Sequence, residues 1–276
     1  MKNDGGEDML KYYVADAFAD TVFEGNPAGV CILDTWLEDE TMRKIAMENN
    51  LSETGFAVKI KDTPCTYELR WFTPKDEIDL CGHCTLGTAY ILFRFYETEE
   101  TEICFHALKC GHVLNVKKDG ELLTMDFPAV PPVPYEYADY MGEALGYEPA
   151  QVLRTERDLM LVYDDAEVIR NMEPDFEKIR RFPIGLSVYV TAKSDDPAYD
   201  IVCRAFWPKL GINEDPVCGS MHTTLVPYWS EVCGKRDIVS REVSPRGGTL
   251  YCTMEGDRVS ISGRCVLYLT GEISVE

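Results

Sequence analysis

Two short cysteine-glycine turns and one glutamate are the parts of this sequence whose types and spacing suit chemistry. The turns are Cys-Gly-His at 81–83 and Cys-Gly-Ser at 218–220, and the glutamate is Glu53. A turn that opens a helix presents unpaired backbone N–H groups and the positive end of the helix dipole, which together bind anions such as carboxylates. A carboxyl group near such a turn is suited to move a proton on the bound molecule.

The two turns belong to a pattern that occurs twice along the chain. Leu-Arg-Trp-Phe-Thr-Pro-Lys at 69–75 recurs loosely as Cys-Arg-Ala-Phe-Trp-Pro-Lys at 203–209, at an offset of 134 (204 − 70). The Cys-Gly turn recurs at an offset of 137 (218 − 81), so the second copy contains a three-residue insertion. Residues 51–58 are likewise echoed by residues 186–192. Sequence motifs that recur at a nearly constant offset predict two similar halves.

Residue patterns within each copy predict a mixed α and β fold. The spacing of apolar residues predicts a helix over 38–49. Strands are expected at 12–18, 56–60, 67–72, 186–191 and 201–207. The turns Asp-Gly at 119–120 and Glu-Gly-Asp at 255–257 predict hairpins over 111–127 and 248–263. A helix over 82–95 is apolar nearly all round, which suits a helix enclosed by a sheet, and its counterpart is expected over 219–229 despite Pro227.

A proline-dense segment at 128–134 separates the two copies. Prolines cannot extend a sheet, so we interpret this segment as a semi-rigid crossover and place the domain boundary there. The predicted halves are 1–130 and 131–276, with the chain ends free to cross from one half to the other.

A quasi-twofold axis relating such halves would bring the two turns face to face. Gly82 and His83 on one side, with Gly219 and Ser220 on the other, would then hold a small molecule that bears a carboxylate. The alternative for each turn is that its glycine only allows the chain to reverse before a buried helix.

Glu53 is a candidate general acid/base because the second copy places Val188 at the equivalent position. Leu51 and Phe56 flank it, and a desolvated carboxyl group favours its protonated form, which suits proton transfer near neutral pH. The alternative is that Glu53 caps a helix or lies at the surface.

Two further polar residues accompany the turns. His83 could orient a carboxylate or donate to a substrate oxygen, although a lone histidine is usually structural. Asp215 precedes the second turn and could bind a substrate amine, but capping the following helix is the simpler interpretation.

Composition limits the partners. The 276 residues include 48 acidic and 27 basic side chains, a net charge of −21, which disfavours binding to nucleic acids and to anionic membranes. No apolar run is long enough for a membrane helix, and no secretory leader is evident, so we expect a cytoplasmic protein. The spacing of the 11 cysteines does not match that of a disulfide-stabilised protein, which indicates buried thiols in a reducing compartment.

Taken together, these motifs resemble the PhzF-like isomerases, which are similar in fold to diaminopimelate epimerase. The resemblance runs through most of the chain and rests on Asp-Ala-Phe at 16–18, Gly-Asn-Pro-Ala-Gly-Val at 25–30, Asn-Leu-Ser-Glu-Thr at 50–54, Phe-Thr-Pro at 72–74, Asp-Leu-Cys-Gly-His at 79–83, Glu-Asp-Pro-Val at 214–217, Gly-Ser at 219–220, Pro-Tyr-Trp at 227–229 and Gly-Asp-Arg-Val at 256–259.

The resemblance implies an α+β fold of two similar halves, each a curved, mostly antiparallel sheet wrapped around a central helix, usually in a homodimer. It also implies that Glu53 is the general acid/base that shuttles a proton on the substrate, that His83 and Asp215 assist, and that the turns at Gly82 and Ser220 bind the substrate. Neither a metal nor an organic cofactor is implied.

Cys218 departs from the family pattern, which generally has threonine there. In the related epimerases and proline racemases, paired cysteines at these two turns act on opposite faces of a substrate carbon, and here Cys81 and Cys218 occupy both positions. A helix N-terminus lowers a thiol pKa, so a two-cysteine racemase or epimerase is the alternative function. Cys218 could equally be a small buried replacement for threonine.

Three other classes stay open at this point. Cys81 and Cys84 form a Cys-x-x-Cys motif of the redox type, but it lacks a second copy. A zinc site would need ligands from Cys104, Cys110 or His112 as well. A non-catalytic small-molecule binding protein would share the same sequence features.

Overall fold

The computed structural model describes residues 9–275, and the chain divides into two compact units. Unit 1 comprises Met1–Asp126 with Gly263–Glu276, and unit 2 comprises Phe127–Ser262. The fold is mixed α and β, with mostly strands and few helices in the described residues, as the sequence predicts.

Unit 1 is a sheet with two helices. Its elements are β1 (Met9–Ala17), β2 (Asn26–Leu33), α1 (Asp39–Asn49), β3 (Glu53–Lys59), β4 (Thr66–Phe72), β5 (Glu77–Ile78), α2 (Gly82–Phe95), β6 (Glu102–Ala107), β7 (Val113–Asp119), β8 (Leu122–Pro128, which continues into unit 2) and β18 (Cys265–Ser274).

Most strand pairs of unit 1 are antiparallel, and two are parallel. β1 pairs with β18 and β2, and β3 with β4, in antiparallel sense. β2 runs parallel to β3, and β4 runs parallel to β6. The strand order is therefore β18, β1, β2, β3, β4, β6, β7 and β8, with the short β5 also on β4.

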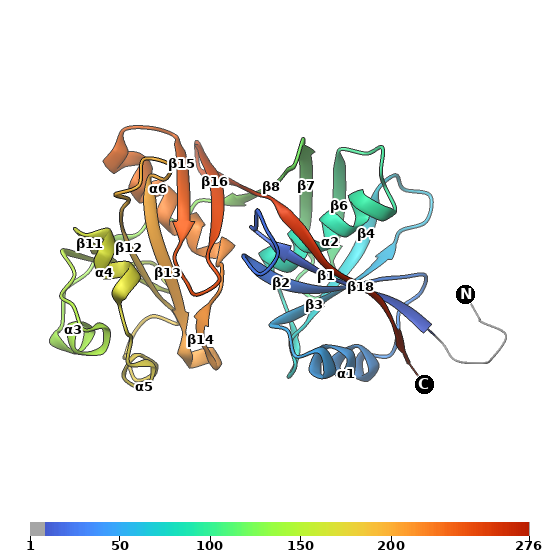
Figure 1. The fold of residues 1–276 in the computed structure, drawn as a ribbon, viewed down its shortest axis with the longest axis horizontal. Helices are drawn as coiled ribbons and strands as arrows, with labels where there is room; N and C mark the ends of the chain where they lie inside the picture. The colour runs from blue at the N-terminus through green and yellow to red at the C-terminus, as the bar shows by residue number, and fades with distance from the viewer. Residues whose placement is uncertain (1–8, 276) are drawn as a thin grey trace. The chain divides into compact units, whose positions relative to one another are not determined.

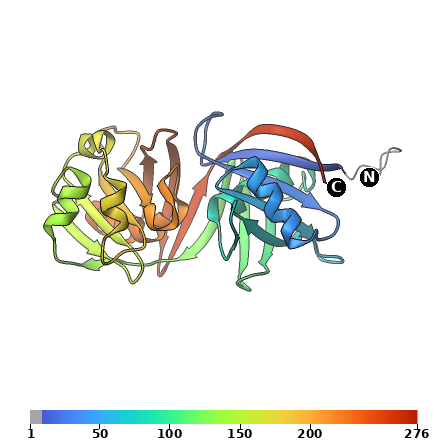
Figure 2. The same ribbon diagram turned by 90° about the horizontal axis from the view of Figure 1, so that it is seen from below.

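Helix α2 is buried on nearly all sides, which explains why its sequence is apolar all round. Its buried residues include Leu86, Ala89 and Leu92, and it packs against β1, β2 and β3 (Figure 1). Helix α1 instead buries one face through Met42, Ile45 and Ala46 and lies outside β3 and β4, as Figure 2 shows.

Unit 2 contains more short helices. Its elements are β9 (Val133–Pro134), α3 (Asp139–Leu145), β10 (Gln151–Arg154), β11 (Leu159–Tyr163), α4 (Ala166–Asn171), α5 (Phe176–Arg180), β12 (Val188–Lys193), β13 (Ile201–Trp207), the 3₁₀ turn η1 (Pro208–Leu210), β14 (Ile212–Asp215), the 3₁₀ turn η2 (Gly219–Met221), α6 (His222–Cys233), β15 (Asp237–Glu242), β16 (Gly248–Glu255) and β17 (Arg258–Gly263).

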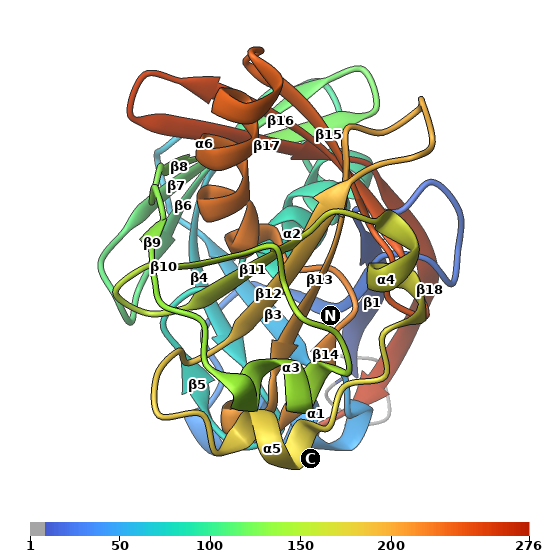
Figure 3. The same cartoon turned by 90° about the vertical axis from the view of Figure 1, so that its left-hand side faces the viewer.

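The strand pairings of unit 2 follow the same order and sense as those of unit 1. β11 is parallel to β12, β12 antiparallel to β13, and β13 parallel to β15, as β2, β3, β4 and β6 are in unit 1. β15, β16 and β17 then follow as an antiparallel run. Helix α6 lies beside β15 and β16 (Figure 3), in the position along the chain that α2 has in unit 1.

A partly buried ion pair occurs at matching strands in the two units. Arg70 of β4 donates to both carboxylate oxygens of Glu77 at 2.8 Å. Arg204 of β13 donates to both oxygens of Glu214 at 2.7 and 2.9 Å. Each pair ties a main strand to the short strand that leads into a Cys-Gly turn.

Most of the predicted elements are confirmed, and two expectations are wrong. Residues 82–95 and 201–207 form the expected helix and strand with those bounds, and both hairpins are present. The proline-dense segment does take part in a sheet, because Val133 and Pro134 pair with β10 at its end. The second helix begins at His222 rather than Gly219, since residues 219–221 form a 3₁₀ turn.

No helix among residues 9–275 is long and apolar enough to cross a membrane.

Candidate functional site

Glu53 opens strand β3 and is almost completely buried. Helix α1 ends at Asn49, and its C-cap residue Asn50 adopts the left-handed conformation and turns the chain back toward the sheet. In the parallel pair of β2 and β3, Glu53 lies opposite Ala28, and Glu53 is 8% exposed. Both alternative interpretations, an N-cap and a surface residue, are therefore wrong for Glu53.

His83 faces Glu53 from the first turn of α2. Its Nε2 lies 3.3 Å from Glu53 Oε2 and 3.5 Å from Ser52 Oγ. The 3.3 Å contact is within ion-pair distance but does not have hydrogen-bond geometry, so Glu53 Oε2 is a buried oxygen without a hydrogen-bond partner among the described residues. An unsatisfied buried carboxyl oxygen is costly for the fold and is typical of a functional site.

Cys81, the N-cap residue of α2, completes the group. Its Sγ lies 3.5 Å from His83 Nδ1, and the residue is 6% exposed. Burial raises the pKa of the Cys81 thiol well above its ordinary value, and the neighbouring Cys84 and the charge of Glu53 act in the same direction, while His83 opposes them. The direction is opposite to the lowered thiol pKa expected at a helix N-terminus, and burial of the thiol is its largest cause.

The second turn also buries its cysteine. Cys218 is the N-cap residue of η2 and is 4% exposed, whereas Ser220 is exposed, with its Oγ 3.5 Å from Cys218 Sγ. Burial raises the pKa of the Cys218 thiol well above its ordinary value, followed by the charges of Asp215 and Glu242, so the predicted thiolate is not favoured here either.

The second turn does not present all of its N–H groups. The backbone N–H of Cys218 donates to Glu242 Oε1 at 2.6 Å, so this donor is satisfied inside the protein. Asp215 ends β14, and the N-cap positions of the following turn and helix belong to Cys218 and Met221, so Asp215 does not take the predicted capping position.

The redox interpretation of the Cys-x-x-Cys motif conflicts with its surroundings. Disulfide exchange requires an accessible thiolate. Cys84 is 0% exposed and Cys81 has a raised pKa, and all 11 cysteines are free thiols.

Two groups of side chains place metal-ligating atoms within 4.8 Å of one another: Glu53 with Cys81 and His83, and Cys203 with His222 and Glu242. These donors are of the kind that zinc prefers. In both groups the histidine nitrogens already face protein partners, which a metal ion would have to displace.

The second group was missed by the sequence reasoning. Cys203, His222, Ser240 and Glu242 lie beneath the turn at 218–220, and their polar types carry no motif. The signal that could have revealed them is a comparison of the two copies position by position, since Leu69, Phe105 and Ala107 of unit 1 correspond to Cys203, Ser240 and Glu242.

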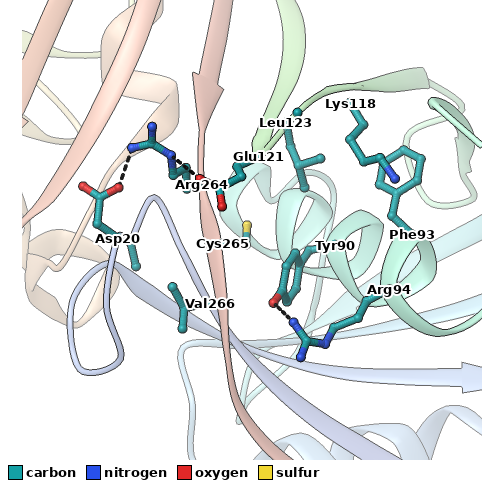
Figure 4. Close-up of a pocket in the computed structure, with 12 residues that line it drawn as sticks. Asp20, Tyr90, Phe93, Arg94, Lys118, Glu121, Leu123, Arg264, Cys265 and Val266 are labelled. Atoms are coloured by element: carbon teal, nitrogen blue, oxygen red, sulfur yellow. Dashed lines mark hydrogen bonds and ion pairs between the residues drawn. The ribbon is translucent and has the colours of Figure 1, made fainter. Parts of the chain in front are cut away.

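A separate cavity of about 320 Å³ lies in unit 1, and Glu53 is not among its lining residues. Figure 4 shows its lining, in which Tyr90, Phe93 and Arg94 come from α2 and Lys118 from β7. Arg264 pairs with Asp20 at 2.7 Å across one side. A second cavity of about 310 Å³ in unit 2 is lined by Pro134, Tyr135 and residues of β10. Neither cavity is lined by Glu53, Cys81, His83 or Cys218.

Comparison with known proteins gives relatives across nearly the whole chain. An uncharacterized isomerase of Pseudomonas aeruginosa is 45% identical over 96% of this chain and 98% of its own length. A crystal structure of a phenazine biosynthesis protein of the PhzF family from Enterococcus faecalis is 42% identical and covers 97% of this chain and 100% of that chain, with a TM-score of 0.92.

A hydroxyproline epimerase from Agrobacterium vitis, solved with bound trans-4-hydroxy-L-proline, shares the fold alone, with 11% identity over 97% of this chain and 92% of that chain and a TM-score of 0.60. Residues 15–271 match the PhzC-PhzF family, described as phenazine biosynthesis-like protein. The chain therefore belongs to the phenazine biosynthesis-like family, whose members include proteins named as isomerases.

Proposed function

We propose that the protein is a cofactor-independent isomerase that moves a proton between carbons of a small metabolite bearing a carboxylate. The observation that carries the proposal is the pairing of Glu53 with His83: a buried carboxyl oxygen without a hydrogen-bond partner in the described residues, 3.3 Å from an imidazole nitrogen. A carboxyl group at this position can act as a general acid/base on a bound substrate.

In the proposed reaction, the Glu53 carboxylate removes a proton from one carbon of the substrate and becomes a carboxylic acid. It then returns that proton to another carbon of the same conjugated system, so the double bond shifts and Glu53 regains its charge. His83 orients the carboxyl group through its Nε2, and Ser52 lies 3.5 Å from the same nitrogen.

The substrate contacts are also proposed. The turns at Gly82 and at Gly219 and Ser220 bind the carboxylate through backbone N–H groups, and Asp215 assists by binding a positively charged group of the substrate. Gly82 and Gly219 are partly exposed, which supports a role in binding.

A two-cysteine racemase or epimerase is the second candidate. It is favoured by two observations: Cys81 and Cys218 are both the N-cap residues of their turns, and Cys81 Sγ lies 3.5 Å from a histidine nitrogen that could accept its proton. The raised pKa of both thiols weighs against it, because the reaction needs a thiolate on one face.

Solvent deuterium uptake tests these proposals together. The protein is incubated in deuterated water with panels of amino acids and cyclic hydroxy-amino acids, and label and optical rotation are followed. A proton shuttle predicts label without loss of rotation, abolished in Glu53→Gln but retained in Cys218→Ser. Deuterium uptake with loss of optical rotation would instead establish inversion, provided that the Cys218→Ser variant no longer takes up deuterium. Binding of a panel compound without any exchange would indicate a non-catalytic binding protein.

A further inference from the structure

Unit 2 contains a polar cluster in a place where a protein core is normally apolar. Its members are Cys203 of β13, His222 of α6, and Ser240 and Glu242 of β15, and each is 0% exposed. The cluster lies directly against Cys218 and contains three ionisable groups, Cys203, His222 and Glu242, that the proposed reaction does not use.

The hydrogen bonds of the cluster have a defined direction. His222 Nδ1 lies 3.0 Å from the carbonyl oxygen of Cys218, and a carbonyl only accepts, so Nδ1 carries the proton. Burial lowers the pKa of His222 to about 4, so the ring is neutral and its Nε2 accepts from the Ser240 hydroxyl at 2.8 Å. Cys203 Sγ lies 3.3 Å from Ser240 Oγ and 3.9 Å from the carbonyl oxygen of Arg241.

Glu242 holds the other backbone group of Cys218. Its Oε1 accepts the Cys218 N–H at 2.6 Å, and its Oε2 is buried without a hydrogen-bond partner in the described residues. Ser244 also ties this segment, because its hydroxyl donates to the carbonyl oxygen of Pro216 at 2.6 Å. Cys218 is therefore held at both its N–H and its C=O by side chains of the core.

Unit 1 shows that the fold does not need this cluster. In unit 2 the parallel pair β13 and β15 places Cys203 opposite Glu242 and Ile201 opposite Ser240. The matching pair β4 and β6 in unit 1 places Leu69 opposite Ala107 and Tyr67 opposite Phe105. The residues of unit 1 that correspond to Cys203, Ser240 and Glu242 are thus apolar and buried: Leu69, Phe105 and Ala107.

Replacing buried apolar residues by ionisable ones costs stability, and a buried carboxyl oxygen without a partner costs more. Unit 1 has the same strand arrangement without these destabilising residues. This difference indicates that the cluster has a role in the Cys218–Ser220 turn.

We propose that Glu242 and His222 are positioning residues, which clamp Cys218 by its backbone N–H and C=O and so hold the Cys218–Ser220 turn in the conformation that binds the substrate carboxylate. This inference rests on the proposed function of the turn. Glu242 and His222 act through the backbone of Cys218 and do not themselves contact the reacting atoms.

Unit 1 supplies the conservative variant for one half of the clamp. There, Thr85 stands four residues after Cys81 and donates its hydroxyl to the Cys81 carbonyl oxygen at 2.6 Å, the contact that His222 makes to Cys218. His222→Thr should therefore keep the clamp. Valine has almost the same shape as threonine but no hydroxyl donor, so His222→Val should lose the hydrogen bond to the Cys218 carbonyl oxygen. Glu242→Gln keeps an acceptor for the Cys218 N–H, whereas Glu242→Leu removes it and leaves an apolar side chain.

The first experiment is hydrogen–deuterium exchange of peptides that cover residues 216–222, measured by mass spectrometry on the full chain. We expect Glu242→Leu and His222→Val to speed exchange of the turn by about tenfold, the effect of losing one hydrogen bond. Glu242→Gln and His222→Thr should stay within about twofold of the wild type. Equal protection in all four variants would overturn the clamp.

The second experiment measures KM and kcat for whichever panel compound exchanges fastest in deuterated water. Because the turn binds the carboxylate in the ground state and in the transition state alike, we expect KM to rise by about tenfold in Glu242→Leu and His222→Val with kcat nearly unchanged. The Gln and Thr variants should restore KM, which a general loss of stability would not predict.

An unchanged KM in variants with a loosened turn would overturn the positioning role. If no panel compound exchanges with the wild type, the proposed function fails, whereas the hydrogen–deuterium comparison still decides the clamp. If Glu242→Leu does not fold, the His222→Thr and His222→Val pair decides both measurements.

Discussion

At the residue scale, Glu53 and His83 are close because the end of α1 and the start of α2 lie next to each other in unit 1. Asn50 ends α1 in a left-handed conformation and leads into Glu53, while the Cys81-Gly82 turn leads into the first turn of α2 with His83. Each side chain is about 90% buried, with exposures of 10% for Glu53 and 9% for His83. The pair therefore lies where a proton on Glu53 is sheltered from bulk water.

The thiols provide a direct residue-scale prediction. Because burial raises the pKa of Cys81 and Cys218 well above the ordinary value, both should stay protonated at neutral pH and react slowly with iodoacetamide. Mass spectrometry of alkylated peptides at pH 7.5 should show both lagging behind the half-buried Cys110 and Cys233, and gaining rate as the pH rises. Rapid alkylation of Cys218 at pH 7.5 would instead support the two-cysteine mechanism.

A second residue-scale prediction concerns acid stability. His222 has a folded-state pKa of about 4, below its ordinary value of 6.5, so the unfolded chain binds the extra proton first as the pH falls. The free energy of unfolding should therefore decrease between pH 6.5 and about 4, by up to about 3 kcal/mol from this one group. Urea unfolding at several pH values should show a smaller decrease in His222→Thr. An identical pH dependence in the two proteins would contradict the assigned neutral state of His222.

The site residues differ in how visible they are in the sequence. Glu53 is noticeable because Val188 replaces it in the second copy, and His83 because it stands in a Cys-Gly turn. Glu242 and His222 cannot be found from motifs, since their importance depends on which backbone groups they reach across strands. The thiol pKa values were predicted in the wrong direction because burial depends on packing that a local helix-start pattern does not contain.

At the scale of elements, the distance between β3 and α2 determines the geometry of Glu53 and His83. Gly55 lies two residues after Glu53, and a Cβ placed there would come within 2.7 Å of Thr88 Oγ1 and 3.0 Å of Cys84 Sγ on α2. The Thr88 hydroxyl is fixed by its bond to the Cys84 carbonyl at 2.7 Å, so it cannot move aside easily. The missing side chain of Gly55 is what allows the helix to pack this closely.

Gly55→Ala should therefore push α2 away from β3 and separate Glu53 from His83. We expect a loss of about 1–3 kcal/mol in the free energy of unfolding, as for other overpacked cores, together with slower solvent deuterium exchange. Gly271→Ala is the matched control, since a Cβ on this other strand glycine of unit 1 meets only Leu269 at 3.6 Å. Equal stability and activity of the two variants would show that the close approach has no role.

The elements themselves were largely predictable where the two copies could be compared. Periodicity and turn residues predicted α2, β13 and both hairpins. Helices α3, α4 and α5 lie between residues 139 and 180, where no repeated sequence motif of unit 1 is present, and they are too short for a clear apolar period. The 3₁₀ turn before α6 was missed because one tight turn has no sequence signature of its own.

At the scale of the whole molecule, a net charge of −21 spread over 276 residues opposes the folded state through repulsion between like charges. Added salt screens this repulsion. Raising NaCl from about 10 mM to about 150 mM should increase the thermal midpoint by a few degrees, as calorimetry can measure. A decrease in the midpoint would mean that surface ion pairs such as Arg43 with Glu40 outweigh the net repulsion.

The most direct test of the central claim is the rate of solvent deuterium incorporation by Glu53→Gln. Glu102→Gln is the matched control, because Glu102 also opens a strand of unit 1 but is exposed. We predict that Glu53→Gln lowers the incorporation rate by about 10²- to 10⁴-fold, the usual contribution of a general acid/base, while Glu102→Gln keeps the wild-type rate. Incorporation by Glu53→Gln at the rate of the control would contradict the account.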